Sequence, residues 1–113
     1  MKTKRINRLT HSWRKAIERV FFNMVMAILS QDKSWCVSRT ETSDEKLQAV
    51  LDYVCGKLDC KEIQPGGSCF DPDTYMNHGS YAIDIDYRAN NVCDQSYALL
   101  TTVDPSFGKC VYP

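Results

Sequence analysis

Six cysteines are the residues in this 113-residue chain whose type and spacing most clearly predict chemistry. All of them follow residue 30, at Cys36, Cys55, Cys60, Cys69, Cys93 and Cys110. A zinc site is disfavoured because no Cys-x-x-Cys pair occurs and because His78 is the only histidine after residue 30. An even number of cysteines in so short a segment predicts three disulfides formed in an oxidising compartment. The spacing alone leaves their pairing open.

Carboxylates are the second group that could do chemistry. Thirteen acidic residues follow residue 30, since Glu18 is the only one of the 14 that precedes it. With so many carboxylates, some pair must fall at the separation that glycosidases use, so such a pair has no diagnostic value. A segment this short also has little room for a cleft that raises the pKa of a catalytic carboxyl group. We therefore expect a protein that is not an enzyme and that holds no metal or cofactor.

The formal net charge of zero conceals two unlike parts of the chain. Residues 1–30 carry a net charge of +6, and residues 31–113 carry a net charge of −6. The basic stretch up to Arg19 and the apolar run at 20–29 follow the order of a secretory signal peptide. Ten residues at about 1.5 Å each are too few for a hydrocarbon core of about 30 Å, so we expect no transmembrane span.

We predict a cleavable signal peptide over 1–30, with cleavage after Ser30, and a secreted, extracellular or cell-wall protein. An uncleaved anchor and a mitochondrial-type presequence are the alternatives for this segment. A basic arm for nucleic acid is disfavoured because the apolar run would be exposed on it. The acidic remainder would repel polyanions, so we expect no nucleic-acid partner. No spacer and hydrophobic tail precede Pro113, so we also expect no glycolipid anchor.

A first helix is predicted over about residues 43–55. Thr42 and Glu45 could form a capping box at its start, or Ser43 could cap it alone. Gly56 predicts its end. Four apolar side chains at i, i+3, i+4 and i+7 predict its buried face: Leu47, Val50, Leu51 and Val54.

A second helix is predicted over about residues 72–89. Asp71 is its expected N-cap, with Pro72 at the first helical position, and Gly79 indicates close packing at the helix backbone. One face of this helix reads as core, at Met76, Ile83 and Tyr87. The neighbouring stripe is polar apart from its tyrosine, at Asn77, Tyr81, Asp84 and Arg88.

Strand composition follows the fifth cysteine, over residues 98–103. Residues 104–108 read as a turn, and 109–112 could return as a second short strand. The predicted fold is therefore a small disulfide-rich α+β domain with two helices, a C-terminal antiparallel β-hairpin and long coil segments.

These elements carry several motifs that occur together in one family. They are Trp35-Cys36-Val37, the run from Leu47 to Gly56, the run from Ile63 to Pro72, His78-Gly79-Ser80-Tyr81-Ala82, and the run from Leu100 to Pro113. With all six cysteines in order, residues 35–113 resemble the plant carbohydrate-binding module of family 43, also called the X-eight domain. Members are found at the C-terminus of endo-β-1,3-glucanases and as free-standing callose-binding proteins of plasmodesmata.

The resemblance implies a disulfide pairing and a function. The pairing would be Cys36 with Cys93, Cys55 with Cys60, and Cys69 with Cys110. The implied function is non-catalytic binding of β-1,3-glucan, such as callose or laminarin, by a monomer at the cell wall, at plasmodesmata or at the plasma-membrane periphery. The alternative is a small secreted defence or inhibitor-like protein that binds no glucan.

A neutral glucan requires an exposed aromatic ring and short polar side chains. The polar stripe of the second helix offers this combination, with Tyr81 as the platform and Asn77, Asp84 and Arg88 beside it. Tyr75, Gln64 and Phe70 lie near the helix start and could extend the surface. We expect that replacing Tyr81 with alanine weakens binding without unfolding the domain.

Overall fold

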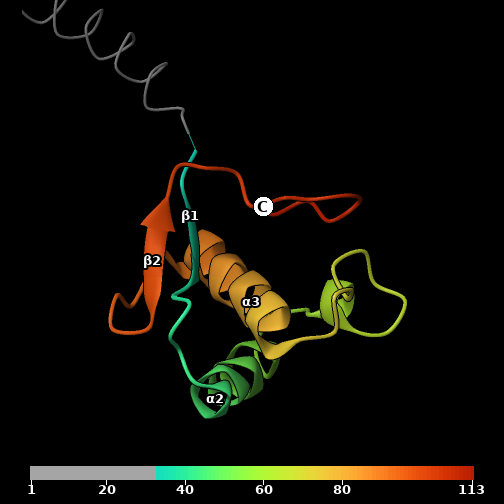
Figure 1. Ribbon diagram of the computed structural model, residues 1–113, viewed down its shortest axis with the longest axis horizontal. Helices are drawn as coiled ribbons and strands as arrows, with labels where there is room; N and C mark the ends of the chain where they lie inside the picture. Colours follow the sequence, from blue (N-terminus) through green and yellow to red (C-terminus); the bar gives the residue numbers. More distant parts are fainter. Residues whose placement is uncertain (1–32) are drawn as a thin grey trace, which may run out of the picture. The chain divides into compact units, whose positions relative to one another are not determined.

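The computed structural model describes residues 33–113, of which 34–113 form one compact unit (Figure 1). The predicted signal peptide at 1–30 lies outside the described residues. None of the helices in the described part has the length and apolar character that a membrane crossing requires. The elements follow the order β1 (Trp35–Ser38), α2 (Asp44–Cys55), η1 (Lys61–Ile63), α3 (Tyr75–Asn90) and β2 (Ala98–Thr101).

Helix α2 forms where the apolar spacing predicts it. Its N-cap is Ser43, whose Oγ accepts a hydrogen bond from the backbone N of Lys46 at 3.1 Å. The Thr42 capping box does not form, because the Thr42 Oγ1 donates to the carbonyl oxygen of Tyr97 at 2.7 Å. The capped helix buries Leu47, Val50 and Val54 in the core.

Helix α3 starts later than predicted. Its N-cap is Thr74, whose Oγ1 accepts from the backbone N of Asn77 at 3.0 Å, so the prediction of Asp71 as cap is wrong. The Asn77 Nδ2 donates to the carbonyl oxygens of Cys69 and Pro72, and this holds the preceding segment as a turn outside the helix. The helix ends at Asn90, and Asn91 follows in the left-handed conformation that commonly terminates helices.

The two strands form one antiparallel sheet, in which Trp35 pairs with Thr101 and Ser38 pairs with Ala98. The predicted strand at 98–103 is confirmed as β2, but its partner is β1, so the predicted C-terminal hairpin is wrong. The segment at 109–112 contributes only an isolated bridge between Phe107 and Cys110. Strand β1 is the better partner because it also packs on α3, so the pairing closes the core on that side.

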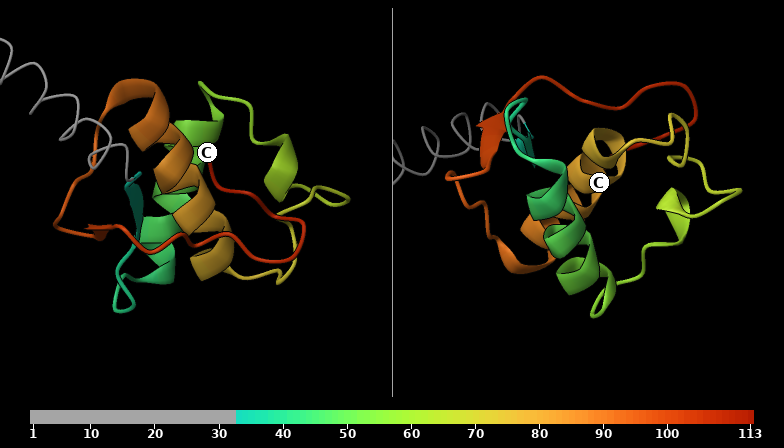
Figure 2. Two further views of the ribbon diagram at one scale, coloured as in Figure 1. Left: turned by 90° about the horizontal axis from the view of Figure 1, so that it is seen from above. Right: turned by 60° about the horizontal axis from the view of Figure 1, so that its bottom comes forward.

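The three disulfides implied by the resemblance are confirmed. Cys36–Cys93 joins β1 to the segment before β2, Cys55–Cys60 joins the end of α2 to the start of η1, and Cys69–Cys110 joins the segment before α3 to the C-terminal coil. The sheet and η1 lie on opposite sides of the two helices (Figures 1 and 2). The disulfides therefore tie the coil segments to β1, to the end of α2 and to each other. Bonds of this kind typically contribute about 2–4 kcal/mol each.

Helices α2 and α3 cross at Gly79, as the glycine predicted. A Cβ at this position would lie 2.7 Å from Cδ2 of Leu47 and 3.3 Å from its Cβ and Cγ. Leu47 is fully buried, so its side chain has little space into which it could move.

We predict that Gly79→Val lowers the free energy of unfolding by about 1–3 kcal/mol, because the branched side chain overpacks this contact. Chemical denaturation followed by circular dichroism measures the change. The matched control is Ala89→Val on an exposed position of the same helix, where only helix propensity changes. Equal losses in the two variants would contradict a tight crossing at Gly79.

Candidate functional site

The predicted polar stripe of α3 is buried at its centre, although Arg88 is exposed and Asn77 is half-buried. Tyr81 is 7% exposed and packs edge-on against Tyr112, which is itself 4% exposed, with ring centroids 5.3 Å apart. Asp84 is fully buried, and its Oδ1 accepts a hydrogen bond from the backbone N of Cys36 at 3.0 Å. The prediction that Tyr81 and Asp84 face a ligand is therefore wrong. The reason is that α2, β1 and the C-terminal coil all pack on α3, which buries every residue from Gly79 to Asp86.

The electrostatics of this core fit a structural role. Burial raises the pKa of the Tyr112 hydroxyl, and the nearby Asp84 carboxylate and Tyr81 raise it further. Burial likewise raises the pKa of Tyr81, with smaller contributions from Glu62, Asp84 and Asp59. Both phenols remain protonated over the physiological pH range, so they serve this core as neutral polar groups.

Two other members of the stripe hold the backbone in place. The Arg88 Nε donates to the carbonyl oxygen of Pro113 at 2.8 Å, and its Nη2 donates to that of Ser34 at 2.7 Å. Arg88 thus joins the C-terminal coil to the residue before β1. Asn77 holds the turn before α3 through its Nδ2, at 2.8 Å from the Cys69 oxygen and 2.9 Å from the Pro72 oxygen.

The remaining predicted residues surround the start of α3. Tyr75 is 43% exposed. Phe70 is half-buried, with its ring centroid 5.0 Å from that of His78. The His78 Nε2 donates to the Phe70 carbonyl oxygen at 2.6 Å, so this histidine holds the segment before α3 against the helix. Gln64 is exposed in the turn after η1.

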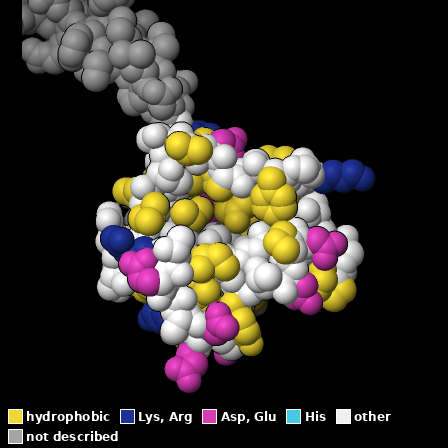
Figure 3. Space-filling model, viewed as in Figure 1, with side chains coloured by type: hydrophobic (Ala, Val, Ile, Leu, Met, Phe, Trp, Pro, Cys, Tyr) yellow, Lys and Arg dark blue, Asp and Glu magenta, His cyan; other side chains and the backbone are white. Residues whose placement is uncertain are grey.

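A groove of about 400 Å³ runs between β1, the first half of α3 and the C-terminal coil. Half of its lining is apolar and half is polar, and no charged side chain lines it. The apolar residues are Val37, Pro72, Met76, Pro105 and Tyr112. The polar residues are Ser38, Thr40, Thr74, Asn77 and Ser80. Figure 3 shows hydrophobic side chains gathered over α3 between β1 and the C-terminal coil, with acidic side chains mostly toward the edge of this face. We call this feature the uncharged groove.

A neighbouring groove of about 350 Å³ lies on the other side of the helix start and shares Thr74 with the uncharged groove. Tyr75 and His78 line it, together with Gln48 and Leu51 of α2 and with Asp73. The Asp73 Oδ1 lies 3.9 Å from the His78 Nδ1. We call this second feature the tyrosine groove.

Of the predicted site residues, Asn77 lines the uncharged groove and Tyr75 lines the tyrosine groove, so no two of them share a groove. Gln64, Phe70 and Arg88 line neither groove, and their contact with a ligand stays a prediction. Sequence reasoning missed the contributions of Thr40 and Pro105, because helix periodicity carries no signal for residues that come from a strand end and a terminal coil. It also assigned Met76 to the core, whereas this half-buried side chain packs on the core and lines the uncharged groove as well.

Comparison with known proteins identifies close relatives over most of the described residues. The chain is 41% identical to glucan endo-1,3-beta-glucosidase 7 of Arabidopsis thaliana over 85 residues, which cover 70% of this chain and 17% of that protein. It is 42% identical to plasmodesmata callose-binding protein 2 of the same plant, over 71% of this chain and 44% of the relative. The major pollen allergen Ole e 10 of Olea europaea is 40% identical, over 72% of each chain.

The coverage differs among these relatives. The chain spans less than a fifth of the glucosidase and less than half of the callose-binding protein, whereas it spans most of the pollen allergen. No solved structure matches the chain. The family model described as the X8 domain matches residues 34–97, which include β1, both helices and five of the six cysteines, and so this chain belongs to the X8 domain family.

Proposed function

We propose that this protein binds β-1,3-glucan without catalysis, through the uncharged groove. The observation that carries the proposal is the absence of charge from the groove lining in a chain in which 25% of the residues are charged. A β-glucan is a neutral polymer with apolar ring faces and many hydroxyl groups. A groove without charges holds such a chain without desolvating unpaired ions.

The lining residues supply both kinds of contact that a sugar chain needs. The half-buried Met76 and Pro105 provide an apolar floor for the CH faces of the sugar rings. The Asn77 Nδ2 is occupied by backbone oxygens, so its Oδ1 can accept from a sugar hydroxyl. Thr74 Oγ1 accepts from a backbone N, so its hydroxyl hydrogen can donate to the sugar.

The tyrosine groove extends the proposed binding surface past the start of α3. Tyr75 presents an exposed ring there, with Gln48 and His78 beside it. Because the two grooves share Thr74, a glucan chain that crosses the helix start can occupy both. In this proposal Tyr75 replaces Tyr81 as the aromatic platform.

The relatives support the choice of polymer. Two kinds of relative are named for β-1,3-linked glucans, as callose-binding protein and as glucan endo-1,3-beta-glucosidases. The match to glucosidase 7 covers only 17% of that enzyme, so the name of the enzyme is no evidence that this chain is catalytic. We place the protein outside the cell, at the cell wall or plasmodesmata, and propose that it acts as a monomer.

We predict that Met76→Ala weakens retention on insoluble β-1,3-glucan about tenfold, because it removes part of the apolar floor of the uncharged groove. The control is Met76→Leu, which keeps the volume and should bind like the unchanged protein. Full chains folded in an oxidising compartment are compared by pull-down and by affinity electrophoresis in laminarin, with cellulose and pectate as control polymers.

Retention should also change little between low and high salt, because no charged side chain lines the groove. Loss of retention at modest salt would indicate a charge-driven partner instead. A folded protein that binds no β-1,3-glucan under either condition would favour the defence or inhibitor-like alternative.

We predict opposite outcomes for two tyrosines that are six residues apart on α3. Tyr81→Ala should lower the free energy of unfolding by about 3–5 kcal/mol, because it leaves a cavity beside Tyr112. Tyr75→Ala should change it by less than about 0.5 kcal/mol and should weaken glucan retention, because its ring is exposed in the tyrosine groove. Denaturation and pull-down together test the pair, and full glucan retention by Tyr75→Ala would remove this residue from the site.

A further inference from the structure

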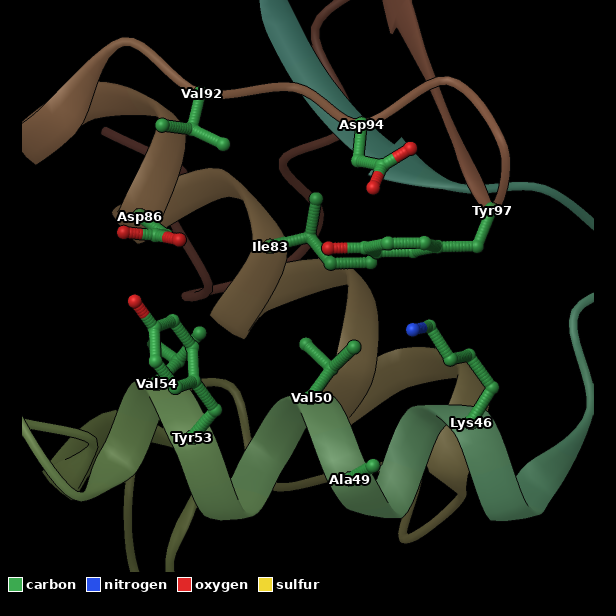
Figure 4. Close-up of a pocket in the computed structure, with 10 residues that line it drawn as sticks. All are labelled: Lys46, Ala49, Val50, Tyr53, Val54, Ile83, Asp86, Val92, Asp94 and Tyr97. Atoms are coloured by element: carbon green, nitrogen blue, oxygen red, sulfur yellow. The ribbon is translucent and has the colours of Figure 1, made fainter.

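A third hollow lies between α2 and the segment at 92–97, and it shares no lining residue with the uncharged groove or the tyrosine groove. Its volume is about 140 Å³, and it is more enclosed than either groove. It is lined by Lys46, Ala49, Val50, Tyr53, Val54, Ile83, Asp86, Val92, Asp94 and Tyr97 (Figure 4). We call it the helix cleft.

Two tyrosines bound the cleft above an apolar floor. Tyr53 stands on α2 with 65% of its surface exposed, whereas Tyr97 is half-buried and reaches across from the opposite segment. Figure 4 shows the hydroxyl end of Tyr97 pointing over Val50 toward Ile83, with Asp86 beyond it. The floor thus offers an apolar contact, while two phenol groups and a carboxylate stand around it.

An ion pair stands at one end of the cleft, between Asp86 of the lining and Lys57, which lies just outside the lining. Lys57 Nζ lies 3.1 Å from Asp86 Oδ1 and donates to the Tyr53 hydroxyl at 3.1 Å. At the other end, the Lys46 Nζ lies 4.5 Å from the centroid of the Tyr97 ring. Hydrogen bonds from the Ser96 side chain and backbone, with the charge of Lys46 as a smaller cause, lower the pKa of Asp94 and keep it ionised.

With Lys57 included, the side chains at the cleft carry two positive and two negative charges. A neutral polar ligand can bind beside the Lys57–Asp86 ion pair without separating it. The carboxylates can accept from hydroxyl groups, the ammonium groups can donate to them, and the tyrosine hydroxyls can do both. The ring faces of Tyr53 and Tyr97 can contact the CH groups of a sugar. Together, these polar and apolar contacts suit a sugar residue.

Size decides which part of a sugar polymer fits. A volume of 140 Å³ is well below the range of about 300–1,000 Å³ in which pockets bury drug-sized ligands, whereas the uncharged groove falls within it. The helix cleft therefore has room for about one sugar residue, whereas the open groove has room for a longer segment of a chain.

We propose that the helix cleft is a second carbohydrate site, which takes a single terminal residue of a neutral glucan. This inference rests on the proposed function, since it assumes that the groove binds glucan. With one site for chain interiors and another for chain ends, one molecule holds two glucan chains together. Two linked sites would also raise the avidity for an insoluble polymer.

Tyr53→Ala tests the second site, because this side chain is largely exposed and lies outside both grooves. Isothermal titration of the full chain with a β-1,3-linked glucohexaose should give two sites per molecule, and one site for Tyr53→Ala. Light scattering of a soluble β-1,3-glucan should rise with the unchanged protein and stay low with Tyr53→Ala. Val103→Ala, at an exposed position that lines none of these hollows, serves as the matched surface control.

The outcomes separate this inference from the proposed function. A single hexaose site in the unchanged protein, with Tyr53→Ala indistinguishable from it, would overturn the second site and leave the groove as the glucan site. A cleft that binds while Met76→Ala has no effect would support the cleft and overturn the groove. Absence of glucan binding in the unchanged protein would overturn both proposals.

Discussion

The rest of this structure depends on the burial of α3 from Gly79 to Asp86. Gly79 admits Leu47 of α2 at a distance that no Cβ would allow. The Asp84 Oδ1 accepts a hydrogen bond from the backbone N of Cys36, and the Ser80 Oγ accepts one from the backbone N of Ser38. Polar side chains of α3 therefore hold the backbone of β1 in place. Buried polar groups are tolerated in a helix that is covered on several sides because they have hydrogen-bond partners of this kind.

This constraint explains where the candidate sites lie. The middle of α3 is committed to packing, so open surface remains where its neighbours separate, at the helix start and beside its second half. The first opening lies between β1 and the C-terminal coil and is uncharged. The second lies between α2 and the segment at 92–97 and is lined by charged side chains of both signs. The two openings therefore differ in size and polarity although the same helix contributes to both.

Several features could be predicted from the residues themselves. The apolar spacing at Leu47, Val50 and Val54 predicted α2, and Gly79 predicted a close crossing. Resemblance to known sequences supplied the disulfide pairing, which spacing had left open. Three expectations failed for physical reasons. Thr74 rather than Asp71 caps α3, and β1 rather than the terminal segment pairs with β2. The stripe of α3 that is polar in sequence is buried at Tyr81 and Asp84.

By itself, the sequence determined the local elements, the number of disulfides and the family, because periodicity, capping residues and cysteine motifs act over short separations along the chain. Only the tertiary structure decided which polar residues are exposed and where a ligand can lie. The grooves combine side chains from a strand end, a helix start and a terminal coil, and the helix cleft joins α2 to residues some forty positions later. Their composition follows from packing in three dimensions, for which no pattern along one element carries a signal.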